Sequence, residues 1–254
     1  MSVILSLVAR KGGVGKTSTA LNLAGAALDD GADTVLLIDM DSQASLSKSL
    51  LGASVVEELR ADETVQAVSE RTKTAGDVAR ETDITGLHIV PSFNDLRVPS
   101  DGALNLAGIE PDLIIIDTPP DIRDHSVRCA LLASTVVVSP VVPEGWGLQS
   151  CHSVQQLLMS AGMVSNQNLF FAGWMMNMVQ KIAIHALCQD TMRRLYGGNV
   201  FDTVLPHAAA FKEAAANGVP VTHGKAKHKA AKSVRAVWSE LMDRATAHYE
   251  REAA

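Results

Sequence analysis

Short apolar runs alternate along the chain with longer segments in which apolar residues recur at helical spacing. The runs are rich in β-branched and aliphatic residues, which is typical of strands covered on both faces of a parallel sheet. We expect strands at Val3–Ala9, Thr34–Asp39, Leu87–Pro91, Leu113–Asp117, Thr135–Pro140, Phe170–Asn177 and Val200–Leu205. This alternation predicts an α/β fold, a doubly wound and mainly parallel sheet flanked by helices.

The segments with helical spacing are Lys16–Asp30, His125–Ala133, Gly147–Ala161, Ile184–Tyr196, Ala208–Asn217 and Lys229–Glu252. The stretch from Leu50 to Gly86 is rich in charge and has no apolar run long enough for a buried strand, so we expect surface helices inserted between two strands. No repeat or low-complexity linker interrupts the chain. We therefore expect one domain over residues 1–254, with a basic helical region at about 222–253.

A glycine-rich segment follows the first predicted strand. Glycines lack Cβ atoms, so such a loop can turn its backbone N–H groups toward phosphate oxygens at the start of a helix. Lys16 would add positive charge at the β- and γ-phosphates, and Thr17 a hydroxyl for Mg²⁺. We expect the phosphates of a nucleotide to contact Gly12, Gly13, Val14, Gly15, Lys16, Thr17 and Ser18. The strict pattern GxxxxGK[ST] fails because its first glycine falls at Arg10, and a plain glycine turn is the alternative.

Two further segments end predicted strands in carboxylates. Asp39 and Asp41 lie two residues apart, hence on the same side of an extended chain, and both can face the phosphates. Four aliphatic residues precede Asp117, and Thr-Pro-Pro follows it. Carboxylates in these places suit a Mg²⁺ site beside the glycine loop, with strand-end caps as the alternative interpretation.

The loop Lys11–Thr17 resembles the deviant Walker A motif of P-loop ATPases in the ParA/MinD superfamily, and the resemblance covers nearly the whole chain. It implies that Lys11 is the extra lysine that reaches across a nucleotide-sandwich dimer to the partner's phosphates. Asp39 and Asp41 resemble the family's DxDxQ segment, which implies that Asp39 helps to organise Mg²⁺ and Asp41 positions the attacking water. By the same resemblance Lys11, Lys16 and Asp41 are catalytic, and Thr17, Asp39 and Asp117 lie on the metal side.

A third block concerns the base of the nucleotide. The segment Leu205–Val221 resembles the family's "IPR…EA…G.PV" block, although His207 and Ala210 stand where the family often has arginine. The resemblance implies that Asn177 hydrogen-bonds adenine and that the backbone around Pro206 lines its edge. A turn residue at the end of a strand is the alternative for Asn177.

Charge is unevenly distributed in a chain whose formal net charge is -6. Acidic residues predominate between Glu57 and Asp83, and basic residues between Lys212 and Arg235. A run of cations could follow DNA phosphates without reading bases, and it consists of Lys225, Lys227, Lys229, Lys232 and Arg235. A solvated start to the last helix is the alternative.

Several classes of protein are disfavoured. The three cysteines, Cys129, Cys151 and Cys188, are odd in number and widely separated, which argues against a disulfide framework or a CxxC metal site. Apolar runs are far shorter than the roughly 20 residues of a membrane span, and no signal peptide is recognisable. We expect a cytoplasmic protein with no membrane partner. The glycine loop begins so early that no helix-turn-helix domain is expected before it.

Together these features resemble a ParA-type partition ATPase. The resemblance implies ATP and Mg²⁺ as ligands, an ATP-dependent homodimer, non-specific DNA binding on the nucleoid, and hydrolysis stimulated by a ParB-like centromere-binding protein. One alternative is a same-fold ATPase that positions a protein complex or the division site, as MinD does. Another is a metabolic enzyme, such as an ATP-dependent synthetase, against which the two-lysine loop argues.

Overall fold

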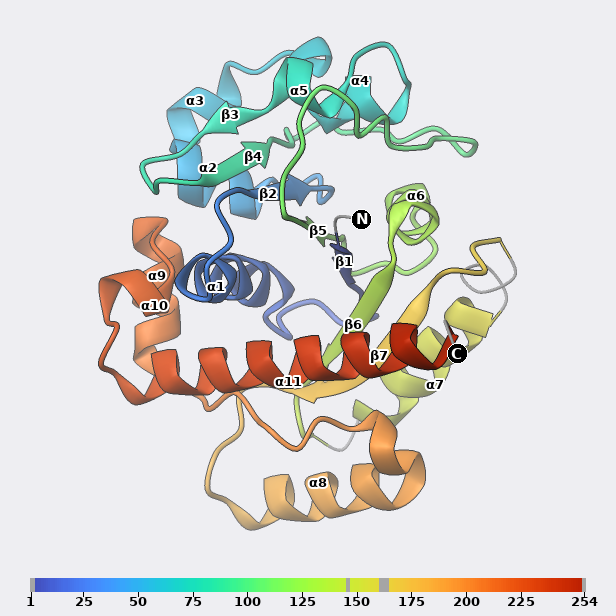
Figure 1. The fold of residues 1–254 in the computed structure, drawn as a ribbon, viewed down its shortest axis with the longest axis vertical. Helices are drawn as coiled ribbons and strands as arrows, with labels where there is room; N and C mark the ends of the chain where they lie inside the picture. The colour runs from blue at the N-terminus through green and yellow to red at the C-terminus, as the bar shows by residue number, and fades with distance from the viewer. Residues whose placement is uncertain (1–2, 145–146, 160–164, 253–254) are drawn as a thin grey trace.

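The computed structural model describes residues 3–144, 147–159 and 165–252, and it contains a seven-stranded sheet in the order β3-β4-β2-β5-β1-β6-β7 (Figure 1). The strands are β1 Val3–Leu7, β2 Val35–Asp39, β3 Arg80–Glu81, β4 Leu87–Val90, β5 Leu113–Asp117, β6 Val136–Val141 and β7 Phe170–Met176. Every neighbouring pair is parallel except β3 with β4. The expected mainly parallel sheet is confirmed.

Helices cover both faces of this sheet (Figure 1). The longer ones are α1 Lys16–Asp29, α6 His125–Ala133, α7 Gly147–Leu157, α8 Ala183–Tyr196, α9 Ala209–Asn217 and α11 Lys229–Glu252. The shorter ones are α2 Ser45–Leu51, α3 Ala53–Glu57, η1 Ala61–Glu63, α4 Val65–Ser69, α5 Ala75–Val78, η3 Gly197–Asn199 and α10 Val221–Gly224. The last two residues of the expected helix Gly147–Ala161, residues 160–161, lie outside the described ranges.

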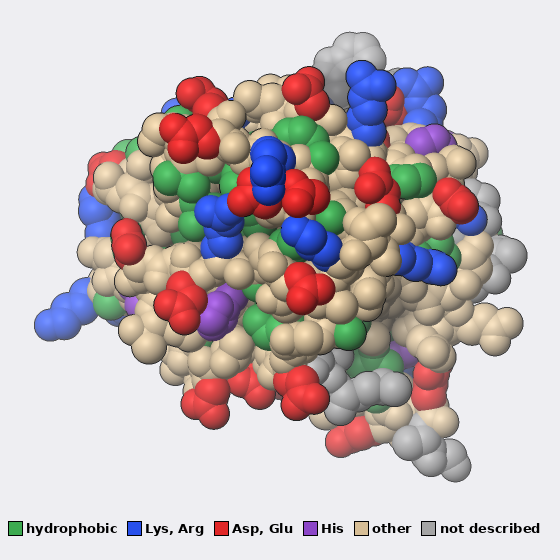
Figure 2. Space-filling model, turned by 90° about the horizontal axis from the view of Figure 1, so that it is seen from above, with side chains coloured by type: hydrophobic (Ala, Val, Ile, Leu, Met, Phe, Trp, Pro, Cys, Tyr) green, Lys and Arg blue, Asp and Glu red, His purple; other side chains and the backbone are tan. Residues whose placement is uncertain are grey.

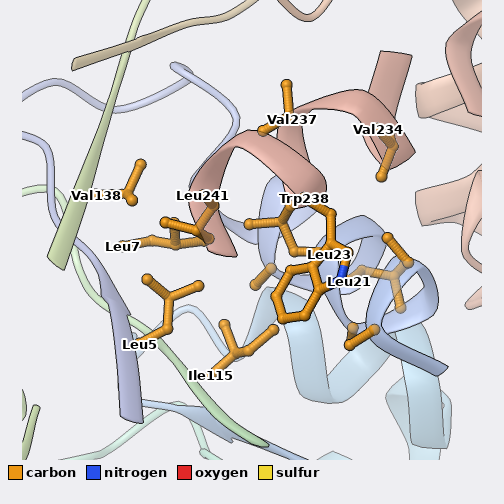
Figure 3. Packing of buried hydrophobic residues seen from close by; sticks show 14 of the residues in the cluster. Leu5, Leu7, Leu21, Leu23, Ile115, Val138, Val234, Val237, Trp238 and Leu241 are labelled. Atoms are coloured by element: carbon orange, nitrogen blue, oxygen red, sulfur yellow. The ribbon is translucent and has the colours of Figure 1, made fainter. Parts of the chain in front are cut away.

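Strand alternation divides the core between the two faces. Leu5 and Leu7 of β1 pack in one cluster with α1 and α11, whereas Val8 belongs to the cluster that contains residues of α6 and α7. Figure 3 shows Leu241 of α11 beside Leu7 of β1. The division is complete in β5, where Leu113 and Ile115 belong to the first cluster and Ile114 and Ile116 to a third, which explains the continuous apolar run of this strand.

The expected strand Val200–Leu205 is wrong. The segment forms one isolated bridge, between Val200 and Trp174, and does not extend the sheet. The backbone N–H groups of Asp202 and Thr203 both donate to the Glu240 carboxylate of α11, at 2.8 Å each. These contacts draw the middle of the segment away from β7, so a continuous ladder cannot form.

The insert Leu50–Gly86 contains short helices, as expected, but also the edge strand β3, which was not foreseen. It is also more than a surface feature, because Val65 and Val68 of α4 are fully buried in the cluster that includes Ile38 of β2. Acidic and basic side chains lie interspersed on the face above the insert (Figure 2). Its acidic residues are partly paired, as in the contacts of Asp62 with Arg60 and Lys73.

Candidate functional site

The glycine loop connects the central strand β1 to α1, which begins at Lys16. Gly13 and Gly15 adopt φ angles of +75° and +87°, a backbone region that disfavours residues with a Cβ atom. Gly15 immediately precedes α1, and a Cβ atom there would lie only 2.5 Å from Nδ2 of Asn177. The sequence therefore needs glycine at this position both for its conformation and for its close packing.

The loop opens onto a cleft of about 500 Å³ at the carboxyl edge of the sheet. Its lining brings together the three motifs found in the sequence, namely Gly12, Gly13, Gly15, Lys16, Thr17 and Ser18 with Asp41, Gln43 and Pro120. These segments meet because β2, β5 and β1 are parallel neighbours, so their carboxyl ends share one edge. Ligands of open α/β sheets bind in such crevices.

Lys16 is 7% exposed at the start of α1. Burial lowers the pKa of its ammonium group, while the charges of Asp117 and Asp41 act in the opposite direction. A helix N-terminus and a buried cation together form a strong site for an anion such as phosphate.

Asp117, at the end of β5, is the most unusual side chain in the cleft region. It is 1% exposed, and its two carboxylate oxygens are the only buried side-chain atoms without a hydrogen-bond partner among the residues that the structure describes. Burial, and secondly the charge of Asp39, raise the pKa of Asp117 to about 8, although the Thr17 hydroxyl and the charge of Lys16 act in the opposite direction. An unpaired buried carboxylate is costly, and a bound cation would compensate for it.

Asp39 and Asp41 are placed differently from each other. Asp39 is fully buried, and its oxygens accept hydrogen bonds from the backbone N–H of Asp41 at 3.1 Å and from the N–H and hydroxyl of Ser47 at 2.9 and 2.7 Å. Burial raises the pKa of Asp39 to about 6 despite these bonds. Asp41 lines the cleft itself and accepts a hydrogen bond from the N–H of Gln43. Asp39 therefore holds the segment that presents Asp41.

Lys11 is half exposed, and its Nζ atom lies 2.9 Å from Oε2 of Glu144 in the same chain. The sequence motifs did not point to Glu144. Its only signal is its position just after β6, a strand adjacent to β1, whose carboxyl end must lie near the glycine loop. The neighbouring Arg10 donates to the hydroxyl of Ser153, in α7.

The expected base-binding residues lie beside a second hollow of about 160 Å³. It is lined by Asn177 and Pro206 together with Ser18, Thr19, Met178, Leu205, His207, Ala208, Phe211, Lys212 and Ala215. Ser18 and Met178 also line the cleft at the glycine loop, so the two hollows adjoin. The side-chain amide of Asn177 is itself bonded to the glycine loop, with Nδ2 2.9 Å from the carbonyl oxygen of Val14.

The five cations of the basic run divide into two groups. Lys225 is paired with Glu213 of α9, and Nε of Arg235 lies 2.7 Å from Oδ2 of Asp29. Lys227, Lys229 and Lys232 are exposed and have no ion-pair partner in the described part of the chain. These three lysines are therefore free to meet an external anion.

Two negative findings apply to residues 3–144, 147–159 and 165–252. None of the helices there has the length and apolar character required to cross a bilayer. No three His, Cys, Asp or Glu side chains gather there into a site for a metal ion. A Mg²⁺ site would thus need oxygen ligands from a bound phosphate or water, as is usual for this ion.

A family model described as the CobQ/CobB/MinD/ParA nucleotide binding domain matches residues 5–221. The chromosome partitioning protein ParA of Myxococcus xanthus is 28% identical over 264 residues, covering 96% of this chain and 89% of the relative. An ATP complex of a McdA variant from Cyanothece aligns with a TM-score of 0.79 at 18% identity, covering 95% of this chain and 96% of that one. Cobyrinic acid a,c-diamide synthase from Mycobacterium smegmatis, with bound ADP and magnesium, gives 0.76 at 20%, covering 95% and 94%. The two structural matches support the fold.

Proposed function

Because this chain belongs to the CobQ/CobB/MinD/ParA family of nucleotide-binding domains, we propose that it is an ATP-dependent switch of DNA partition. In this proposal two subunits dimerise with ATP, bind DNA non-specifically and hydrolyse ATP when a ParB-like protein stimulates them. The observation that carries the ATPase part is the unpaired carboxylate of Asp117 beside Lys16 at the glycine loop. The similarity to a chromosome partitioning ParA supports the role in partition.

ATP is the proposed substrate of the phosphate cleft, and its base occupies the hollow beside Asn177 and Pro206. The backbone of Lys11–Ser18 and the ammonium of Lys16 would bind the phosphates. Mg²⁺ would be held by Thr17 and Asp117 with help from Asp39, and the unpaired oxygens of Asp117 fit such a cation. When bound, this ion supplies positive charge that stabilises the phosphates during transfer.

Asp41 is the proposed catalytic carboxylate because it lines the cleft, whereas Asp39 is occupied by hydrogen bonds to Ser47 and to the Asp41 backbone. Phosphoryl transfer depends mainly on positioning and charge stabilisation, so Asp41 needs only to orient the attacking water. We assign Lys11 the role of contacting the phosphates of the ATP bound to the other subunit. To make that contact it must first leave Glu144.

DNA binding is assigned to the exposed lysines of the basic run. Lys227, Lys229 and Lys232 would neutralise phosphates, whereas Lys225 and Arg235 hold the run against α9 and α1 through Glu213 and Asp29. Contacts of this kind carry no sequence information, which suits a protein that must bind anywhere on a nucleoid.

Phosphate release from ATP, measured with and without duplex DNA and with a ParB-like partner, tests the proposal. We expect slow basal hydrolysis, stimulation when DNA and partner are both present, and retention on DNA only with ATP. Lys16→Ala, which removes the buried cation, is the inactive control. Hydrolysis that ignores DNA but is coupled to a small organic acid would establish a synthetase instead. Hydrolysis stimulated by a protein complex without DNA would favour an ATPase that positions that complex.

A further inference from the structure

We propose that Asn177 is a positioning residue, which holds the glycine loop in its phosphate-binding conformation and thereby sets the affinity for the phosphate chain. This inference deepens the proposed function and rests on it. It assigns Asn177 a role different from the adenine contact that the family resemblance implies. The geometry that supports it lies entirely within the chain.

The side-chain amide of Asn177 joins three separate segments. Its Nδ2 atom donates to the carbonyl oxygen of Val14 at 2.9 Å and lies 3.4 Å from Oγ1 of Thr19 in α1. Its Oδ1 atom accepts from the backbone N–H of Met178 at 2.8 Å. A carbonyl oxygen can only accept and a backbone N–H can only donate, so these partners fix the orientation of the amide.

The position of Asn177 is equally constrained. Its side chain is 6% exposed, and its own N–H donates to the carbonyl oxygen of Val141 at 2.8 Å, which anchors it to β6. Gly15 packs so closely that a Cβ atom would lie 2.5 Å from Nδ2. The amide thus supports the loop at the turn that immediately precedes Lys16.

These contacts restrict what Asn177 can offer to a base. Both hydrogens of Nδ2 point to atoms of the loop and of α1, so a base that took either one would leave Val14 or Thr19 without that contact. Recognition of the base then falls to the other residues that line the hollow, among them Pro206 and His207. The phosphates, by contrast, depend directly on the conformation that Asn177 maintains.

The test compares Asn177→Asp with the wild-type protein using ATP, GTP and inorganic tripolyphosphate, which has no base. Aspartate has nearly the same shape but cannot donate to Val14, and a lost buried hydrogen bond of this kind weakens binding by about tenfold or more. Because aspartate also adds a negative charge near the phosphates, Asn177→Leu, which adds none, must show the same loss. We expect the affinities for ATP and tripolyphosphate to fall by similar factors, with the ATP-to-GTP ratio unchanged. Titration calorimetry, with competition for the weaker ligands, measures all three.

A matched control separates this role from general destabilisation. Nδ2 of Asn166 donates to the carbonyl oxygens of Leu131 and Ser134, away from the cleft, so Asn166→Asp should lower thermal stability without changing either affinity. If Asn177→Asp binds tripolyphosphate like the wild type but loses affinity for ATP, Asn177 contacts the base and the inference is wrong. If the wild type binds neither ATP nor tripolyphosphate, the proposed function fails first.

Discussion

At the scale of single residues, the buried carboxyl group of Asp117 destabilises the fold and could bind a cation. Its two buried oxygens have no partner within the described ranges, and its pKa is raised to about 8, first by burial. The aspartate pKa is about 4 in an unfolded chain, so the folded state binds this proton more tightly between those two values. The contribution of Asp117 to the free energy of unfolding therefore falls as pH rises through this window.

Asp117→Asn tests this linkage in protein freed of nucleotide and metal by a chelator. The variant cannot titrate at this position, so its free energy of unfolding should decrease less between about pH 5 and pH 8 than that of the wild type, by roughly 1–3 kcal/mol. Urea unfolding at the two pH values gives the comparison. The variant should also lose the stabilisation that Mg²⁺ and ATP give the wild type. Equal pH slopes would show that Asp117 does not carry the raised pKa.

Asp41→Ala addresses the proposed chemistry. Since Asp41 lines the cleft but does not anchor α2, as Asp39 does through Ser47, the variant should fold and bind ATP normally. Its hydrolysis rate should fall by about 100-fold or more, and the ATP-bound dimer should accumulate. Size-exclusion chromatography with ATP and a phosphate-release assay measure these effects. Asp83→Ala, which changes an exposed carboxylate of the insert, serves as the control. Normal turnover by Asp41→Ala would remove Asp41 from the mechanism.

The motif residues that line the cleft at the glycine loop could be identified from the sequence, because their motifs are short and each follows its own strand. The side chains and backbone groups that contact these residues from distant parts of the chain could not be predicted. Glu144 beside Lys11, and Val14 beside Asn177, are separated from those residues by most of the chain. Nor does the sequence reveal which cations of the basic run are paired. Only the packing of the chain brings Glu213 to Lys225 and Asp29 to Arg235.

At the scale of elements, the contact between α2 and α9 closes one side of the cleft, because Ser49 of α2 and Ala215 of α9 both line it. The hydroxyl of Ser49 donates to the carbonyl oxygen of Ala215. Gly218, which ends α9 with φ +63°, lies so near that a Cβ atom would be 2.1 Å from the carbonyl oxygen of Ser49. The backbone of α2 cannot yield easily, since Asp39 holds its first turn through Ser47.

Gly218→Ala should therefore destabilise the protein by roughly 3 kcal/mol, through strain at positive φ together with a clash against backbone. Gly31→Ala is the matched control, because Gly31 follows the end of α1 with φ +104° but has nothing within 4 Å of a Cβ atom. It should cost only about 1 kcal/mol. Urea unfolding of both variants measures the difference. Equal losses would mean that the close approach of the two helices contributes nothing.

Among the elements, long segments with a clear period were predicted best. The range of α6, His125–Ala133, and that of α11, Lys229–Glu252, match the sequence expectation. The errors lie where side chains compete for backbone groups. In the expected strand Val200–Leu205, the N–H groups of Asp202 and Thr203 donate to the carboxylate of Glu240. The local sequence of the segment does not predict this contact, because Glu240 belongs to α11.

At the scale of the whole molecule, the basic run is held against α9 and α1 by its paired cations, while three of its lysines remain exposed. Lys227→Glu combined with Lys229→Glu should weaken retention on DNA and reduce the slope of log affinity against log salt by about 2, one for each lost phosphate contact. Gel-shift titrations at several salt concentrations measure both effects. ATP binding should be unchanged.

Arg71→Glu combined with Arg97→Glu provides a control with the same change of net charge, because both side chains are exposed outside the basic run. This variant should retain DNA nearly as well as the wild type. Equal losses in the two double variants would show that net charge alone governs binding and that the run has no special role. If the lysine variant binds DNA as tightly as the wild type, the basic run does not contact DNA.

The strand order also determines when the site can exist during synthesis. β1 does not pair with β2, its nearest neighbour in sequence, because β5 lies between them and Val3 pairs with Leu113. A ribosome therefore releases the glycine loop long before the strands that flank β1 are available. A nascent chain that ends before Asp117 carries every residue of the glycine loop and still lacks the edge of the sheet beside which the loop lies. Nucleotide can then promote folding only after β5 has emerged, so in the cell the ligand could act only once about half of the chain has been made.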